Sequence, residues 1–260
     1  MLKLRHLAVA VPLTAILWGC GPEDMQDAGS TKPQSEAGPT LGTATQELGS
    51  VGAYSWASPA DATSMGSTAN RVCFLDRIQG NFVSGSSAVD VFASGGSFYL
   101  KGSGDTRATA RCAGMTSANA LSGEYTWKAA QALPTNMGTA TGRVCFLVRV
   151  SGSFAGSADW ARVYVSGGSW FLFGNSQKGD GGAQARCVTV PSYSGEYSWN
   201  STQSYDTHMG ATAGRVCALT YMGGRFDVMG DYIDVYGAAG SWYLGGAAAS
   251  GPVYAKSRCF

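Results

Sequence analysis

Charged residues and histidines are scarce in this sequence. Asp, Glu, Lys and Arg make up 13% of the 260 residues, about half the share of roughly 25% in soluble proteins. The segment after residue 50 holds 15 basic and 12 acidic residues and a single histidine, His208. This near-neutral balance does not suggest nucleic acid or a strongly anionic partner. One histidine and no cluster of alternating Asp or Asn provide neither a zinc site nor a calcium loop, so we expect no metal and no cofactor.

Long apolar runs are also missing, except at the N-terminus. Lys3 and Arg5 precede an almost wholly apolar run, Leu7 to Trp18. This run is shorter than the roughly 20 apolar residues that a membrane-spanning helix needs. A charged start followed by such a run is typical of a secretory signal. The run ends in Leu17-Trp18-Gly19-Cys20, which resembles the lipobox at which bacterial lipoprotein precursors are cleaved and acylated.

This resemblance implies that residues 1–19 are a signal peptide and that Cys20 carries acyl chains such as palmitate. Acyl chains contribute about 0.8 kcal/mol per buried methylene, so they would hold the protein on a membrane without a spanning segment. Gly21 follows the cysteine, where an Asp would resemble an inner-membrane retention signal. We therefore expect a lipid anchor in the outer membrane of a bacterial envelope, facing the periplasm or the outside. The alternative is an ordinary signal peptide with a chance cysteine.

Residues 20–50 contain no aromatic side chain and few large apolar ones. Five acidic residues face one basic residue, Lys32, and Gly, Pro, Ser, Thr and Ala dominate. Such a segment cannot bury enough apolar surface to offset its ordering entropy, so we predict a disordered tether.

Three copies of one unit follow the tether. Trp56, Trp127 and Trp199 lie 71 and 72 residues apart, and each is the third residue of a Tyr-Ser/Thr-Trp triplet. Self-similarity at a fixed period is the signature of a repeat architecture. We place the repeats at 51–116, 117–190 and 191–260.

Two cysteines recur in each copy. They are Cys73 and Cys112, Cys145 and Cys187, and Cys217 and Cys259. The chain has seven cysteines, so a lipidated Cys20 leaves six that can all pair. Because each copy must look alike, we predict one disulfide within each repeat; bridges between repeats are the alternative, and they would break the internal symmetry. Domains of about 70 residues have a small hydrophobic core and usually need a cross-link such as a disulfide to be stable.

Within a copy the signals are those of β-strands. Short runs rich in Val, Phe, Tyr and Trp alternate with Gly, Ser and Asn clusters, without sustained helical periodicity. In the third copy we predict strands near 195–199, 215–221, 225–228, 232–236, 241–245 and 253–259. Turns are predicted at Gly223-Gly224 and Ala239-Gly240, with a hairpin turn at Gly179-Asp180-Gly181-Gly182 in the second copy. The expected fold is all-β: three tandem sandwich-like repeats with possible pseudo-threefold symmetry.

Several strings resemble repeats of secreted, disulfide-containing lipoproteins of Gram-negative bacteria that have no assigned activity. They are Arg143-Val144-Cys145-Phe146-Leu147, Ser166-Gly167-Gly168-Ser169-Trp170 and Ala185-Arg186-Cys187. The resemblance covers about 51–260. It implies the arrangement of repeats and cysteines, and it implies no catalytic or binding residues. The unit also looks faintly like trimeric β-sandwich modules of phage tail fibres and small lectins, which three copies in one chain could imitate.

No catalytic constellation stands out. His208 replaces Ser64 and Asn136 of the other copies, no nucleophile-elbow sequence is present, and every cysteine has a role. Asp231 and Asp234 form the best acid pair, but three residues apart on a strand they point to opposite faces. We therefore do not expect an enzyme.

The recurrent arginines have two interpretations. Arg71, Arg143 and Arg215, with Arg111, Arg186 and Arg258, could form three anion or sugar-acid sites. More often such residues tie a strand to a loop carbonyl or carboxylate. We favour this structural role.

Two aromatic residues break the repeat. Trp160 and Tyr232 align with Ala88 and follow Asp159 and Asp231. Aromatic rings beside carboxylates suit carbohydrate recognition, because the ring stacks on sugar C–H groups and the acid accepts hydroxyl hydrogen bonds. Equally, they could pack one repeat on its neighbour. The leading hypothesis is thus a membrane-anchored binding protein for envelope or extracellular polysaccharide, and the rival is a structural or spacer subunit that contacts an envelope protein.

Overall fold

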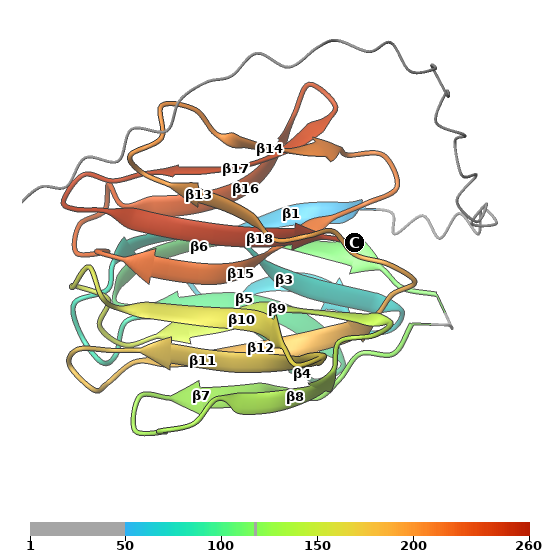
Figure 1. The fold of residues 1–260 in the computed structure, drawn as a ribbon, viewed down its shortest axis with the longest axis horizontal. Coiled ribbons are helices and arrows are strands. Elements are labelled where there is room, and N and C mark those ends of the chain that lie inside the picture. The colour runs from blue at the N-terminus through green and yellow to red at the C-terminus, as the bar shows by residue number, and fades with distance from the viewer. Residues whose placement is uncertain (1–49, 117–118) are drawn as a thin grey trace, which may run out of the picture. The chain divides into compact units, whose positions relative to one another are not determined.

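A computed structural model describes residues 50–116 and 119–260, which fall within one compact unit, Ala44–Phe260. The described part contains strands and no helix, and in Figure 1 the strands lie broadly along one axis, with arrows pointing both ways. The predicted all-β class is confirmed. The predicted signal peptide, Cys20 and all but the last residue of the predicted tether lie outside the described residues.

Each repeat contributes six strands. The first contains β1 (Ser50–Ala57), β2 (Thr63–Ser67), β3 (Arg71–Asn81), β4 (Ala88–Ser94), β5 (Ser97–Ser103) and β6 (Asp105–Gly114). The second contains β7 (Tyr125–Lys128), β8 (Thr135–Thr139), β9 (Arg143–Ser151), β10 (Trp160–Ser166), β11 (Ser169–Asn175) and β12 (Gly182–Thr189). The third contains β13 (Tyr197–Asn200), β14 (Thr207–Ala211), β15 (Cys217–Gly224), β16 (Tyr232–Ala238), β17 (Ser241–Ala247) and β18 (Val253–Cys259).

The strands form three six-stranded sheets, and every sheet combines two repeats. Sheet A has the order β1-β6-β3-β16-β17-β14, sheet B β2-β5-β4-β9-β12-β7, and sheet C β13-β18-β15-β10-β11-β8. Each repeat therefore gives three strands to one sheet and three to another, in cyclic order. We call the junctions β3–β16, β4–β9 and β10–β15 the seams. Each seam is a short antiparallel ladder of three residue pairs.

A ring of backbone hydrogen bonds links the three repeats. Phe82 N donates to Phe226 O at 2.6 Å, Phe226 N to Phe154 O at 2.6 Å, and Phe154 N to Phe82 O at 2.7 Å. The three side chains are fully buried, and the Phe82 ring packs edge-on against both others. This closed cycle is pseudo-threefold, and the buried apolar residues of all three repeats form one cluster. The repeats thus share one core.

A second cluster of phenylalanines compensates for a break in the repeat. Phe74 and Phe146 are equivalent and lie 5.4 Å apart between ring centroids, but the third copy has Ala218 at this position. Phe260 supplies the missing ring, with centroids 5.8 Å from Phe74 and 5.9 Å from Phe146. Because protein interiors are close-packed, the ring fills space that an alanine leaves.

The three disulfides lie within repeats, as predicted. Cys73 bonds Cys112, Cys145 bonds Cys187, and Cys217 bonds Cys259. The two cysteines of each pair stand opposite each other in neighbouring strands. The alternative of bridges between repeats is wrong.

Sheet edges meet at three corners, where a threonine joins them. Thr63, Thr135 and Thr207 each donate from the hydroxyl to a backbone carbonyl of the preceding edge strand, at 3.0, 2.8 and 2.8 Å. This contact partly covers edges that would otherwise be open to pairing with other chains.

Three local predictions for strands and turns are wrong. Residues 225–228 form no strand, because the backbone of Phe226 bonds to Phe154 and Phe82 of the other repeats rather than to a sheet. Consequently Gly223-Gly224 ends β15 instead of making a turn; a Cβ on Gly224 would lie 2.1 Å from the carbonyl oxygen of Pro252. The segment at Gly179–Gly182 connects sheet C to sheet B, so it is no hairpin.

One strand was not predicted, and one turn prediction is confirmed. β14 contains a polar Thr-His pair and a bulge between His208 and Gly210, which hides its alternation. Ala239 and Gly240 have φ of 48° and 78° and join β16 to β17. Two positive φ angles in a two-residue loop match the right-handed twist of a hairpin.

Replacing Phe260 by alanine should lower the free energy of unfolding by about 3–5 kcal/mol, because the cavity between Phe74 and Phe146 cannot collapse within the shared core. Adding Ala218→Phe to this variant should restore part of the loss, since its ring would enter the equivalent place. Urea denaturation measures both. Equal stability of Phe260→Ala and the wild type would contradict the packing role.

Candidate functional site

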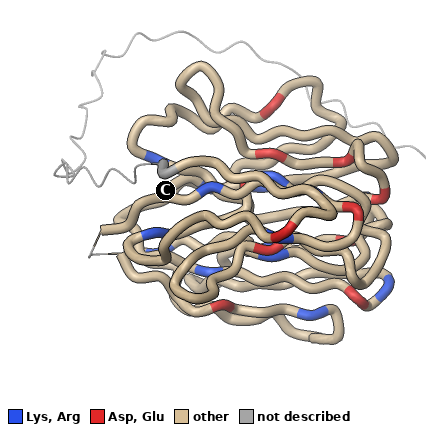
Figure 2. The backbone as a smooth tube through the Cα atoms, turned by 180° about the vertical axis from the view of Figure 1, so that it is seen from behind, with Lys and Arg blue, Asp and Glu red and all other residues tan. Residues whose placement is uncertain are grey.

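The outward faces of the three sheets carry the same framework. Each hairpin bears one stacked aromatic pair of half-buried rings, with centroids 5.5–5.7 Å apart and planes at 22–29°. The pairs are Phe92–Tyr99 on sheet B, Tyr164–Phe171 on sheet C and Tyr236–Tyr243 on sheet A. Beside them lie three ion pairs: Arg149–Asp90 on sheet B, Arg162–Glu196 on sheet C and Arg77–Asp234 on sheet A. Charged positions are otherwise sparse and of mixed sign (Figure 2).

Sheet C extends its pair into a larger aromatic platform. Trp160 stacks on Tyr221 across the seam with centroids 6.3 Å apart and planes at 22°, and it meets Phe173 edge-on at 5.8 Å. We define the platform as Trp160, Tyr164, Phe171, Phe173 and Tyr221. All five rings are half-buried, so each keeps part of its surface in solvent.

A glycine makes the stack of Trp160 and Tyr221 possible. Gly223 stands opposite Trp160 in the seam, where the other sheets have Gln79 and Ser151. A Cβ on Gly223 would lie 2.3 Å from the Tyr221 hydroxyl oxygen. The Tyr221 side chain therefore lies across the glycine, and a larger residue there would push it off.

Charged groups border the platform. Glu196 accepts from Arg162 and from Lys256, each at 2.8 Å, and the Arg162 guanidinium lies 5.3 Å from the centre of the Tyr164 ring. Burial raises the pKa of Tyr221 above its ordinary value, so its hydroxyl stays neutral and can both donate and accept. The site thus offers flat rings, one hydroxyl and fixed polar groups.

Sheet A has a smaller, more acidic face. Arg77 pairs with Asp234 at 3.3 Å and covers the Tyr232 ring at 4.1 Å. The Tyr236 hydroxyl donates to Asp206, and this bond raises the pKa of Tyr236 to about 12. Exposed His208 meets the Tyr243 ring at 5.4 Å.

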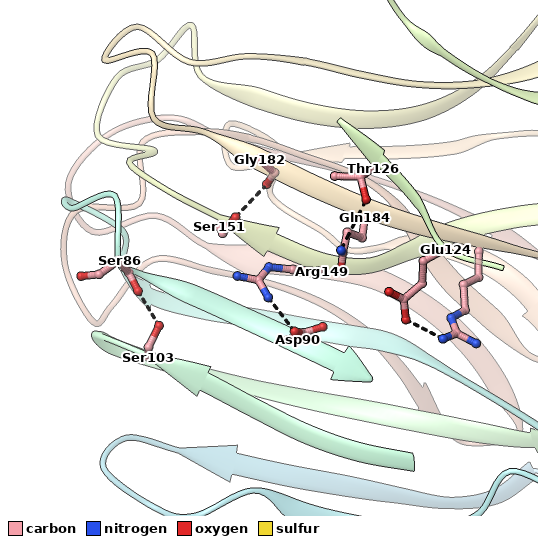
Figure 3. A network of polar contacts seen from close by, with 10 residues as sticks. Ser86, Asp90, Ser103, Glu124, Thr126, Arg149, Ser151, Gly182 and Gln184 are labelled. Carbon is pink, nitrogen blue, oxygen red and sulfur yellow. Dashed lines mark hydrogen bonds and ion pairs between the residues drawn. The ribbon is translucent and has the colours of Figure 1, made fainter. Parts of the chain in front are cut away.

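Sheet B carries a polar network instead of a platform. Arg149 pairs with Asp90 across the seam at 2.8 Å, and Arg186 pairs with Glu124 (Figure 3). On sheet B the residue equivalent to Trp160 is Ala88, which is buried. This face therefore presents hydrogen-bonding groups and few rings.

The structure separates the four residues that the sequence suggested as a ligand site. Trp160 lies on sheet C and Tyr232 on sheet A, while Asp159 and Asp231 are 2% and 0% exposed. Each carboxylate accepts from the backbone of its own repeat: Asp159 from Gln177 N at 2.6 Å and Gly156 N at 2.8 Å, and Asp231 from Ala249 N at 2.6 Å. Ligand contact by these acids stays a prediction, and we leave them out of the platform.

The recurrent arginines make structural contacts across repeats. Arg111, Arg186 and Arg258 lie 4.8, 5.9 and 5.4 Å from the ring centres of Trp242, Phe98 and Trp170, each ring belonging to the preceding repeat in the cycle. Arg111 also pairs with buried Asp76 at 3.3 Å, and Arg71 donates to the Met65 carbonyl. These contacts support the structural interpretation.

Sequence reasoning missed most of the platform. Tyr164, Phe171 and Phe173 alternate with buried residues along their strands, and this period of two could have placed them on the outward face. The contact between Tyr221 and Trp160 could not be found in this way, because the two residues lie in different repeats and meet only across a seam.

Comparison with known proteins adds no family. A scan against protein-family models finds no match, and a search of curated proteins finds none. Within the described residues, no helix is long and apolar enough to cross a membrane. The same residues contain no group of three His, Cys, Asp or Glu side chains that could hold a metal ion.

Asp234 should make stability depend on pH. Burial, with Asp76 and Asp206 nearby, raises its pKa to about 6 despite Arg77, compared with about 3.9 in an unfolded chain. The folded state then binds the proton more tightly, so stability falls as pH rises from about 4 to 6 and stays lower above. We expect Asp234→Asn to match the wild type at pH 4 and to exceed its unfolding free energy by on the order of 1–2 kcal/mol at pH 7.5.

Urea unfolding across this range measures the difference. Arg77→Gln serves as the control, because removing the cation should steepen the loss of stability with pH. An Asp234→Asn variant that is less stable than the wild type at pH 7.5 would show that the ion pair outweighs the desolvation.

Proposed function

We propose that this protein is an extracytoplasmic binding protein that recognises polysaccharide through the platform on sheet C. The observation that carries this proposal is the row of half-exposed rings at Trp160, Tyr221, Phe173, Tyr164 and Phe171. All five rings keep part of their surface in solvent, and Phe173 also packs edge-on against the buried Trp127 ring of the shared core. Flat ring surfaces contact sugar C–H faces, while nearby polar groups hydrogen-bond hydroxyls.

The border of the platform suggests the class of sugar. Arg162 and Lys256 share one carboxylate, Glu196, so the local charge is slightly positive. A neutral or weakly acidic polysaccharide fits this balance better than a cationic one. The rings lie on both sides of the seam between β10 and β15, so the site suits a chain segment rather than a single sugar in a deep pocket. Because the face offers no group of catalytic residues, we infer binding without turnover.

The expected anchor completes the proposal. A lipid on Cys20 and a tether over 20–50 would hold the domain at the outer membrane of a bacterial envelope. Binding there would connect the envelope to extracellular or envelope polysaccharide. Metabolic labelling with palmitate, lost in Cys20→Ser, tests the anchor separately from the platform.

The rival function is a structural spacer, and one observation favours it. Trp160 stacks across the seam between the second and third repeats, and Tyr232 lies under Arg77 across the seam between the third and the first. Rings at seams can serve packing alone.

The platform can be replaced by residues that the fold already uses. The first copy has Ala88 and Lys101 where the second has Trp160 and Phe173, so Trp160→Ala with Phe173→Lys makes sheet C resemble sheet B. We expect this variant to stay folded and to lose about fivefold to 100-fold in affinity, since two ring contacts of about 0.5–1.5 kcal/mol each are removed. A glycan array followed by affinity electrophoresis in polysaccharide gels measures binding.

Two matched variants control this experiment. Tyr205→Ala removes an aromatic residue that is 71% exposed and outside the platform, and Tyr232→Ala removes the sheet A residue suggested by the sequence. Both should keep full affinity. Unchanged retention of a folded Trp160→Ala, Phe173→Lys variant would remove the platform proposal. Lower thermal stability with unchanged glycan binding would favour the spacer.

A further inference from the structure

A tyrosine fills a slot between two repeats at the sheet C side of the molecule. The Tyr193 ring lies 5.5 Å from the Trp170 ring centre, and the Arg258 guanidinium lies 5.6 Å from the Tyr193 ring centre. Its hydroxyl donates to the Ala140 carbonyl at 3.2 Å. The phenol thus touches an indole, a guanidinium and one backbone acceptor.

The equivalent slot of the sheet A side has the same walls. Trp242 corresponds to Trp170, and each indole N–H donates at 3.0 Å to the backbone carbonyl of the equivalent arginine, Arg215 or Arg143. Arg111 corresponds to Arg258 and lies 4.8 Å from the Trp242 ring centre. The two indoles are therefore held in the same way.

What differs is the residue type at this register of the backbone. At the register of Tyr193, the second repeat has Leu121, paired with Val188, and the first has Ser50, paired with Ala113. Beside Trp242 lies a cavity of about 440 Å³, lined by Arg111, Thr212, Trp242 and the hairpin tip Gly237–Gly240. No ring of a described residue occupies it. Gly237 also replaces Val165, which widens the space.

The charge in this cavity is already balanced. Arg111 pairs with Asp76, which is 2% exposed, at 3.3 Å. A second anion would gain little from this arginine, and a cation would face it. The face of a neutral ring remains the favourable partner for the guanidinium and the indole. The Thr212 carbonyl stands at the sequence position of Ala140; it accepts from Arg215 N at 3.4 Å and has a second lone pair for a hydroxyl.

From this internal template we propose that the cavity at Arg111 and Trp242 is a binding site for a neutral phenolic ring, the tyrosine side chain of a partner protein. The volume lies within the range of about 300–1,000 Å³ typical of ligand pockets. The site is separate from the platform on sheet C. It allows the protein to dock a partner while the platform holds polysaccharide.

p-Cresol, the tyrosine side-chain analogue, is the probe. We expect a saturable shift of the Trp242 indole N–H resonance in the full-length protein, with a dissociation constant on the order of 1 mM for so small a ligand. Methyl β-D-glucopyranoside should leave this resonance unchanged. Gly237→Leu should abolish the shift, because a Cβ there meets Trp242 at 3.9 Å and a larger side chain fills the space.

Tyr193→Ala provides the positive control. It should create the same slot beside Trp170, with the indole, the guanidinium and the Ala140 carbonyl still in place, and engineered cavities bind small aromatic rings. p-Cresol should then also shift the Trp170 resonance. Rebinding at Trp170 without any saturable shift at Trp242 would overturn the proposal, as would binding at neither site. A response of Trp242 to the glucoside but not to p-cresol would equally overturn it.

Discussion

Strand pairing between different repeats holds this molecule together. Each repeat divides its six strands between two sheets, and each seam consists of three residue pairs. A repeat by itself would keep two half-sheets with unpaired edges and an uncovered apolar face, which is an unstable arrangement. The repeats are therefore parts of one cooperative unit, and the backbone ring through Phe82, Phe154 and Phe226 closes it.

The disulfides and the core stabilise different parts of this unit. Each disulfide joins neighbouring strands inside one repeat and crosses no seam. The repeats are joined to one another by the seams, by apolar packing that includes Phe260 in the place left by Ala218, and by arginines that cover rings of the preceding repeat. Because these contacts involve mainly residues that face the interior, the residues that alternate with them on the outward face of each sheet can differ between repeats. That freedom produced a platform on sheet C, a polar network on sheet B and a slot beside Trp242 that no ring of the described residues fills.

The sequence by itself determined the three copies and the β class, and it favoured the disulfide pairing within repeats that the structure confirms. These features are local or repeat at fixed positions, so their spacing and alternation could be read directly. It also marked Trp160 and Tyr232 as departures from the repeat, but it attached them to Asp159 and Asp231, which the structure buries in loops. Only the tertiary structure decided that each sheet combines two repeats, because strands exchanged between copies have the same periodicity as strands kept within one. For the same reason the neighbours Trp160 and Tyr221, and Arg111 and Trp242, became visible only in the folded chain, where seams bring distant residues together.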